Sequence, residues 1–165
     1  MTFSIHEASA PVLVRALTNL SAMIDKALAA GVSEAALLEA RLAPDMHPFP
    51  RQIQMASDSA KGAIARLTGT EVPAMPDTET TVAELKERIA KTIAYVTSLD
   101  AAAFAGSEDR EVVLTFPGNS MTFTGAQFLT GFALPNFYFH VAMAYALLRA
   151  NGAPIGKMDF LGGPR

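Results

Sequence analysis

The sequence contains no cysteine among its 165 residues. This absence excludes a disulfide framework, a thiol nucleophile and any zinc or iron–sulfur site built on cysteine, so only histidine and oxygen ligands are left for a metal. The chain also lacks a basic cluster, because its 13 Lys and Arg and 16 Asp and Glu are scattered and give a net charge of −3. We therefore expect no nucleic-acid partner and no binding to an anionic membrane.

Sequence signals for export and for covalent catalysis are also missing. The first residues, MTFSIHEASAPVLVRAL, lack a basic segment followed by an uninterrupted apolar one, so we expect no signal peptide and a cytoplasmic protein. No Gly-rich phosphate loop or GxSxG elbow is present, and Ser57 and Ser59 have no histidine at a meaningful spacing. Hydrolysis by a covalent triad is therefore not expected. The length suits one domain, predicted to cover residues 1–165.

Charged residues are absent from Val112 to Leu148. An uncharged run of this length has to be tested as a membrane span. A Pro-Gly-Asn-Ser turn at residues 117–120 interrupts it, and polar side chains that are costly against lipid recur later: Thr122, Thr124, Gln127, Thr130, Asn136 and His140. We therefore expect no membrane partner and interpret the second part of the run as a helix buried on most sides.

Apolar residues at three- and four-residue spacing predict four long helices. The predicted ranges are about Ser9 to Ala30, Pro48 or Pro50 to about Leu67, Thr81 to about Ser98, and Thr124 to Asn151-Gly152 with a kink or restart at Pro135. A short helix is predicted to start at Ser33. These patterns favour an all-α four-helix bundle.

Two further segments complete the predicted fold. The β-prone runs Val112 to Phe116 and Met121 to Phe123 predict a small hairpin inserted between the third and fourth helices. The tail, GAPIGKMDFLGGPR, is too rich in glycine and proline for a helix. We expect it to run back along the bundle and to pack its apolar side chains there, namely Ile155, Met158, Phe160 and Leu161.

Asn136 and His140 form a polar pair in the apolar fourth helix. Residues four apart share a helix face, and bundles commonly build their sites in the core, so a metal or ligand would have access to both side chains. A structural interpretation competes with this one. Pro135 leaves backbone carbonyls near residue 131 without their usual partners, and a buried amide or imidazole can satisfy one of them.

Two blocks of sequence resemble a known group of proteins. PNFYFHVAMAYALLRANGAPIGKMDFLG, residues 135–162, and RLAPDMHPFPRQIQMASDSAKGAIARLTG, residues 41–69, are similar to a bacterial family of unassigned function in the DinB/YfiT-like superfamily. The resemblance implies a four-helix bundle, frequent homodimers and often nickel or zinc held by three histidines, one on the second helix and an H-x-x-x-H pair on the last. Some members are thiol-dependent transferases or hydrolases.

This sequence departs from that histidine pattern. His140 matches the second histidine of the pair, but Asn136 replaces the first, and Gln54 is the nearest equivalent on the second helix. An amide oxygen is a far weaker ligand for zinc or nickel than imidazole. The positions around the second helix leave two other candidates. Gln52 and Ser57 lie nearer the apolar stripe of this helix than Gln54 does, so either can be the group that faces His140. 

Three residues are further candidates for an organic ligand pocket. Tyr138 and Tyr145 each carry a hydroxyl among the aromatic residues of the fourth helix, and His47 lies in the proline-rich segment before the second helix. Three hypotheses follow. The chain is a metal-dependent enzyme with a degenerate site at His140, Asn136 and Gln54; a binder of a small molecule without metal; or a structural homodimer in which the polar pair repairs the proline kink.

Overall fold

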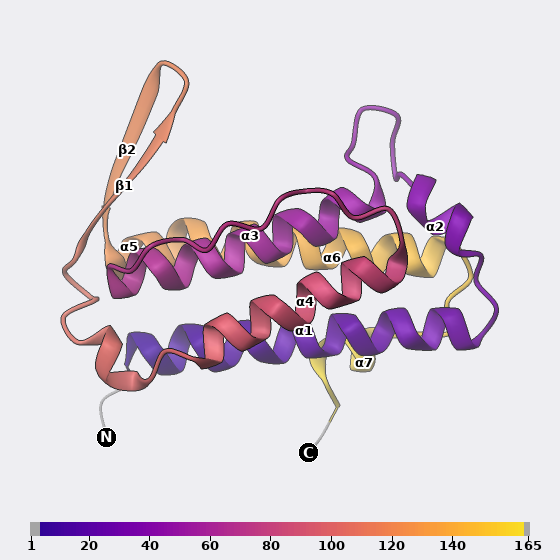
Figure 1. Cartoon of the computed structure of the whole chain (residues 1–165), viewed down its shortest axis with the longest axis horizontal. Coiled ribbons are helices and arrows are strands. Elements are labelled where there is room, and N and C mark those ends of the chain that lie inside the picture. The colour runs from indigo at the N-terminus through magenta and orange to yellow at the C-terminus, as the bar shows by residue number, and fades with distance from the viewer. Residues whose placement is uncertain (1–3, 164–165) are drawn as a thin grey trace.

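The computed structural model describes residues 4–163, a mostly helical chain (Figure 1). The first three and last two residues of the predicted domain lie outside this range. Four long helices lie side by side: α1 (Ile5–Ala29), α3 (Phe49–Thr68), α4 (Val82–Thr97) and α6 (Leu134–Ala150). Both α3 and α1 pack against α4 and α6, so one apolar core lies among the four. The prediction of a helical fold with a small antiparallel hairpin is confirmed.

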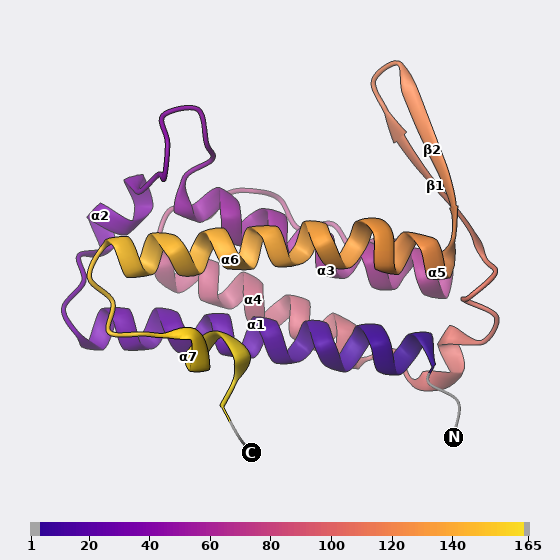
Figure 2. The same ribbon diagram turned by 180° about the vertical axis from the view of Figure 1, so that it is seen from behind.

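The direction of the helices explains the longest extended connection. In Figures 1 and 2, α1 and α6 run one way and α3 and α4 run the other way. Because α3 and α4 are parallel neighbours, the segment 69–81 between them has to return along their whole length. Its sequence is mostly polar and contains Pro73 and Pro76. In the structure this segment contributes contacts to both helices, as described below.

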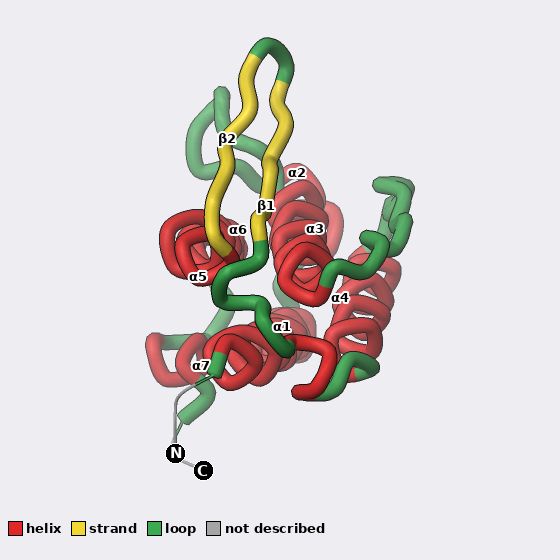
Figure 3. The backbone as a smooth tube through the Cα atoms, turned by 90° about the vertical axis from the view of Figure 1, so that its left-hand side faces the viewer, coloured by secondary structure: helices red, strands yellow, loops and turns green. Residues whose placement is uncertain are grey.

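The hairpin projects from one end of the helices (Figure 3). Strands β1 (Glu111–Phe116) and β2 (Asn119–Thr124) pair antiparallel, with Val112 opposite Phe123 and Leu114 opposite Met121. The turn is Pro117-Gly118, in which Gly118 has a φ of 78° that disfavours other residues. A 3₁₀ turn, η1 (Ala101–Phe104), precedes it, and a short helix, α2 (Glu34–Glu39), lies in the connection between α1 and α3.

Local capping signals set most helix starts. The predicted helix starts at Thr81 and Thr124 are observed, and both are capping boxes. Each threonine hydroxyl accepts from the backbone N–H three residues on, and the side chain of Glu84 or Gln127 accepts from the backbone N–H of that threonine. A third box, Ser4 with Glu7, starts α1 four residues earlier than predicted. Pro11, which the predicted start at about Ser9 placed in the first turn, therefore lies in the second turn of α1.

The fourth predicted helix differs from expectation in two ways. Of the kink or restart predicted at Pro135, the restart is absent: α5 (Gly125–Phe128), a π turn, η2 (Leu129–Ala133), and α6 follow one another as a continuous helix. The wider π turn accommodates the proline that a regular α-helix would exclude. Nor is the helix buried on most sides, since only 39% of its most apolar stretch is buried and Phe139 is half exposed.

Residues 125–150 form the one helix in the described range that is long and apolar enough to cross a membrane. This criterion concerns length and composition only. One side of the helix packs on α3 and α1 and contributes Phe137, Val141 and Ala144 to the core. The helix is therefore buried on one side and exposed on the other, although its sequence is apolar on both.

The C-terminal tail runs back along α1, as predicted, but it contains a short helix, α7 (Lys157–Leu161), where none was expected. Asp159 caps it by accepting from the backbone N–H of Gly156 at 2.7 Å. Ile155 is buried and Phe160 is half-buried, whereas Met158 and Leu161 are about half exposed. Of the four apolar side chains predicted to pack against the bundle, only Ile155 and Phe160 are therefore well buried.

Candidate functional site

His140 on α6 is 4% exposed and hydrogen-bonds to α3. Its Nδ1 lies 2.9 Å from Oε1 of Gln52. The amide nitrogen of Gln52 donates to the backbone carbonyl of His47 at 3.1 Å, so the amide oxygen is the atom that faces the imidazole. It follows that Nδ1 carries a proton and that Nε2 holds the lone pair when the ring is neutral.

The surroundings of His140 favour that neutral form. Burial lowers the pKa of His140, and electrostatic interactions with His47 and Arg51 lower it further. Near neutral pH the ring is therefore uncharged, with one nitrogen bound to Gln52. The other, Nε2, makes no hydrogen bond within residues 4–163 and is not among their fully buried, unpartnered atoms, so it reaches solvent.

Asn136 lies one turn before His140 and also bonds to α3. Its Nδ2 donates to Oγ of Ser59 at 2.8 Å. Neither this amide nor the imidazole bonds to a carbonyl near residue 131, where the π turn adjusts the helix instead. The observed contacts thus favour a role between α3 and α6 over repair of the backbone at Pro135.

The structure brings Gln52 to His140 and leaves Gln54 apart from it. Gln54 donates to Glu79 Oε2 at 3.0 Å and accepts from Arg51 at 3.3 Å. The helical angles had pointed to Gln52 as an alternative, whereas the family resemblance had pointed to Gln54. The third candidate, Ser57, bonds to Thr92 on α4 and therefore faces another helix pair.

The three candidates for a ligand pocket do not come together. Tyr138 and Tyr145 are half-buried and pack against Phe160 of the tail, with ring centroids 6.4 and 5.8 Å from it. His47 is exposed in the segment before α3, although its carbonyl accepts from Gln52. The tyrosines thus join α6 to the tail, and His47 alone lies beside the Gln52–His140 pair.

The donors around His140 do not fit a nickel or zinc site. Residues 4–163 contain no group of three His, Cys, Asp or Glu side chains placed to hold a metal ion. The neighbouring side chains are the exposed imidazole of His47 and two amides, and the amides of Gln52 and Asn136 already bond to His140 and Ser59. Two imidazoles beside engaged amides fall short of the three or four ligands that hold either metal. The metal implied by the resemblance stays a prediction that these residues do not support.

A cavity of about 290 Å³ lies between α3, the hairpin and the helix that runs from α5 into α6. Asn136 and Ser59 form part of its floor. Phe128 and Phe132 line it with stacked rings 6.1 Å apart at 19°. Its remaining lining residues are Arg51, Met55, Asp58, Ala63, Arg66, Leu114, Thr115, Phe116 and Ala133. Sequence reasoning missed this cavity, because no local pattern places the hairpin beside α3.

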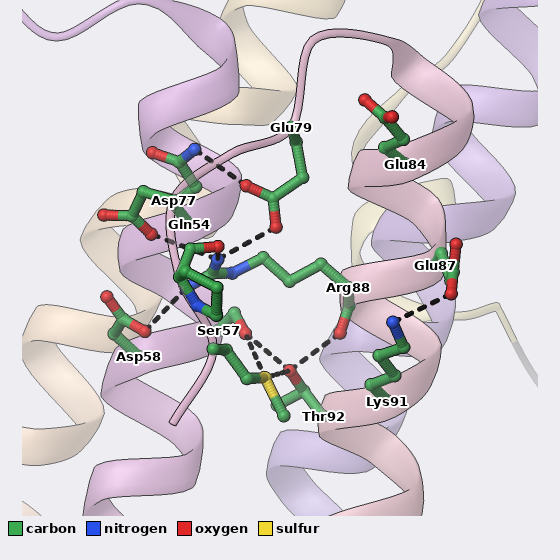
Figure 4. Close-up of polar contacts among 12 residues, drawn as sticks. Gln54, Ser57, Asp58, Asp77, Glu79, Glu84, Glu87, Arg88, Lys91 and Thr92 are labelled. Carbon is green, nitrogen blue, oxygen red and sulfur yellow. Dashed lines mark hydrogen bonds and ion pairs between the residues drawn. The ribbon is translucent and has the colours of Figure 1, made fainter. Parts of the chain in front are cut away.

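A second polar cluster lies on the α4 side of α3 (Figure 4). Arg88 of α4 is 3% exposed and pairs with Asp58 on α3 at 2.8 Å and with Asp77 and Glu79 on segment 69–81 at 3.0 and 2.9 Å. It also donates to the carbonyl of Pro76. Burial alone would raise the pKa of Glu79, but hydrogen bonds from Arg88 and Gln54 outweigh it and lower that pKa. This cluster fixes segment 69–81 to α3 and α4.

Comparison with known proteins places the chain in a family without assigning an activity. Residues 5–161 match the model of a domain of unknown function, DUF1993. A crystal structure of a DinB family member protein from Shewanella denitrificans is similar to this one, with a TM-score of 0.87 and 38% sequence identity. The similarity covers 97% of this chain and 93% of that one. The search of curated proteins found no match.

Proposed function

The chain belongs to the DUF1993 family of domains of unknown function, and from its cavity and its DinB-like structure we propose that it binds a small, largely apolar molecule. In this proposal the four long helices are a DinB-like four-helix bundle, and the ligand lies between α3, α6 and the hairpin. Binding, without a metal-dependent reaction, is the role that these residues support best.

One observation carries the proposal: a pair of stacked aromatic rings and a hydrogen-bonded polar pair line the same cavity. Phe128 and Phe132 stack on one side, and Phe123 lies 6.2 Å from each ring. The Ser59–Asn136 pair lies on the floor. An apolar lining with a few convergent polar groups is typical of small-molecule sites, and the volume is near the low end of their usual range of roughly 300–1,000 Å³.

The metal-dependent enzyme has less support. His140 offers one free imidazole nitrogen, but the residues beside it are amides that are already hydrogen-bonded. A reaction would also need a nucleophile or a general base at the cavity. His140 is not among its lining residues, and the carboxylate that is, Asp58, is paired with Lys61 and Arg88. The homodimer and the cytoplasmic location stay predictions.

We would test binding with phenylacetamide, a neutral aromatic probe, titrated into the protein by ligand-observed NMR. We expect saturable binding that Phe132→Ala weakens about fivefold, because an aromatic contact contributes roughly 0.5–1.5 kcal/mol. Ala63→Met, which fills the cavity from α3, should weaken binding as well. This second variant keeps the test informative if Phe132→Ala folds poorly.

The matched control is Phe139→Ala. Phe139 is on the same helix but is half exposed and outside the cavity, so its removal should leave the affinity unchanged. Absence of binding, or equal weakening by Phe132→Ala and Phe139→Ala, would overturn the proposal. Circular dichroism and the melting temperature of each variant would establish that it is folded.

A further inference from the structure

Two of the three charged side chains that line the cavity already have partners. Arg51 pairs with Asp77 on segment 69–81. Asp58 forms ion pairs with Lys61 at 3.1 Å and with Arg88 at 2.8 Å. The cavity therefore presents little free negative charge, although a carboxylate lines it. The third charged residue, Arg66, is different.

Arg66 has no carboxylate partner within residues 4–163. The paired ions beside the cavity balance, because Arg51, Lys61 and Arg88 share Asp58, Asp77 and Glu79, three charges of each sign. Arg66 is outside this set, and its Nη1 donates only to the carbonyl of Gly62 on its own helix at 2.9 Å. One positive charge without a carboxylate partner is therefore left among the residues that line the cavity, in a chain whose net charge is −3.

A glycine inside α3 allows this position of Arg66. A Cβ added at Gly62 would lie 2.6 Å from Arg66 Nη1, closer than real side chains approach. Glycine in a helix interior usually costs stability relative to alanine, so its presence there suits a need for space. Gly62 lets the guanidinium of Arg66, which is exposed, lie back along α3 and donate to the Gly62 carbonyl, at a position that lines the cavity.

The floor adds a second free donor. Ser59 Oγ accepts from Asn136, but no residue in the described range accepts from the Ser59 hydroxyl itself. The amide oxygen of Asn136 likewise receives no hydrogen bond there. A ligand in the cavity can therefore contact the Ser59 hydroxyl, the Asn136 amide oxygen and the Arg66 guanidinium. The rings of Phe128 and Phe132 line the same cavity.

We propose that the ligand is a small carboxylic acid with an aromatic or branched apolar body, whose carboxylate binds Arg66 and whose body packs on Phe128 and Phe132. The inference rests on the proposed function and adds the chemical class of the ligand. A guanidinium presents parallel N–H donors that match the two oxygens of a carboxylate. The apolar body replaces water along the phenylalanine wall.

The test compares phenylacetate with phenylacetamide, which share a shape and differ in charge. We expect phenylacetate to bind about tenfold more tightly, since a hydrogen bond to a charged group has roughly that effect. In Arg66→Gln, phenylacetate should bind only as tightly as the amide, while the affinity for the amide stays unchanged. Arg15→Gln on α1 removes an exposed charge outside the cavity and should change neither affinity.

The outcomes separate the two claims. If both probes bind equally, or if the preference for phenylacetate survives in Arg66→Gln, the carboxylate inference is wrong, although amide binding that is sensitive to Phe132→Ala still supports the proposed function. If neither probe binds, both claims fail. If inorganic phosphate displaces phenylacetate at comparable concentration, Arg66 is an unselective anion site and the proposed ligand class is also wrong.

Discussion

The burial of His140 makes the stability of the fold depend on pH. In the folded chain its pKa lies below the ordinary value of 6.5, because burial and then the charges of His47 and Arg51 disfavour the imidazolium. A depressed pKa contributes stability above the unfolded value, and this stability is lost as the pH falls through the folded value. Folding should therefore weaken below pH 6.5, before the carboxylates begin to titrate.

Replacing His140 with glutamine should remove this dependence. Between about pH 7.5 and about pH 5.5 the wild type should lose more free energy of unfolding than His140→Gln, by at most about 1.4 kcal/mol per pH unit. Urea unfolding at both pH values measures the difference. His47→Gln should reduce the loss only in part, because burial is the larger cause. Equal losses in the wild type and His140→Gln would contradict this account.

At the level of the elements, two glycines in the continuous helix allow a matched comparison. A Cβ at Gly125, at the start of α5, would lie 1.8 Å from the carbonyl oxygen of Ser107, a backbone atom that cannot move aside easily. A Cβ at Gly131, in the π turn, would meet no atom within 4 Å. The same substitution should therefore have opposite effects at the two positions.

We expect Gly125→Ala to lower the free energy of unfolding by about 3 kcal/mol, because the helix start or the hairpin has to shift. Gly131→Ala should raise it by about 0.5–1 kcal/mol, since alanine favours a helix over glycine. Urea denaturation of both variants gives the two values. Destabilisation of similar size in both would show that the contact with Ser107 is not what limits position 125.

These elements also show how far the sequence leads. The boxes at Thr81 and Thr124 and the hairpin were predictable, because each depends on neighbours a few residues apart. Which faces of α6 are buried was not predictable, since the sequence of an uncharged helix does not show which side packs against the neighbouring helices. The choice of Gln52 over Gln54 depends on how α3 and α6 are rotated against each other, and the cavity depends on where the hairpin lies.

For the whole molecule, the parallel arrangement of α3 and α4 depends on how segment 69–81 is held. Arg88 holds the segment against both helices. It pairs with Asp58 of α3, and it contacts the segment through Asp77, Glu79 and the carbonyl of Pro76. Removing one member of a buried ion cluster leaves the remaining charges poorly compensated. The loss should therefore affect the connection between the two helices, beyond one surface contact.

Arg88→Met should lower the free energy of unfolding by about 3 kcal/mol, near the low end for a broken buried pair because Asp58 and Asp77 are partly exposed. Hydrogen exchange should become faster in residues 69–81. Lys86 is on the same helix as Arg88, and Lys86→Met removes its more exposed pair with Asp25 of α1. This variant should cost less than about 1 kcal/mol and leave that exchange unchanged. Similar costs for both variants would contradict the assigned role of Arg88.

Acid supplies an independent test of the same cluster. The pKa of Glu79 lies below its ordinary value of 4.5, so the stability that this carboxylate contributes is present above pH 4.5 and is lost as the pH falls through its folded value. Arg88→Met removes the partner that keeps Glu79 ionised. Below pH 4.5 the wild type should therefore lose stability more steeply than Arg88→Met, measured by urea unfolding. Parallel losses would place the acid-sensitive carboxylates outside the segment that joins α3 to α4.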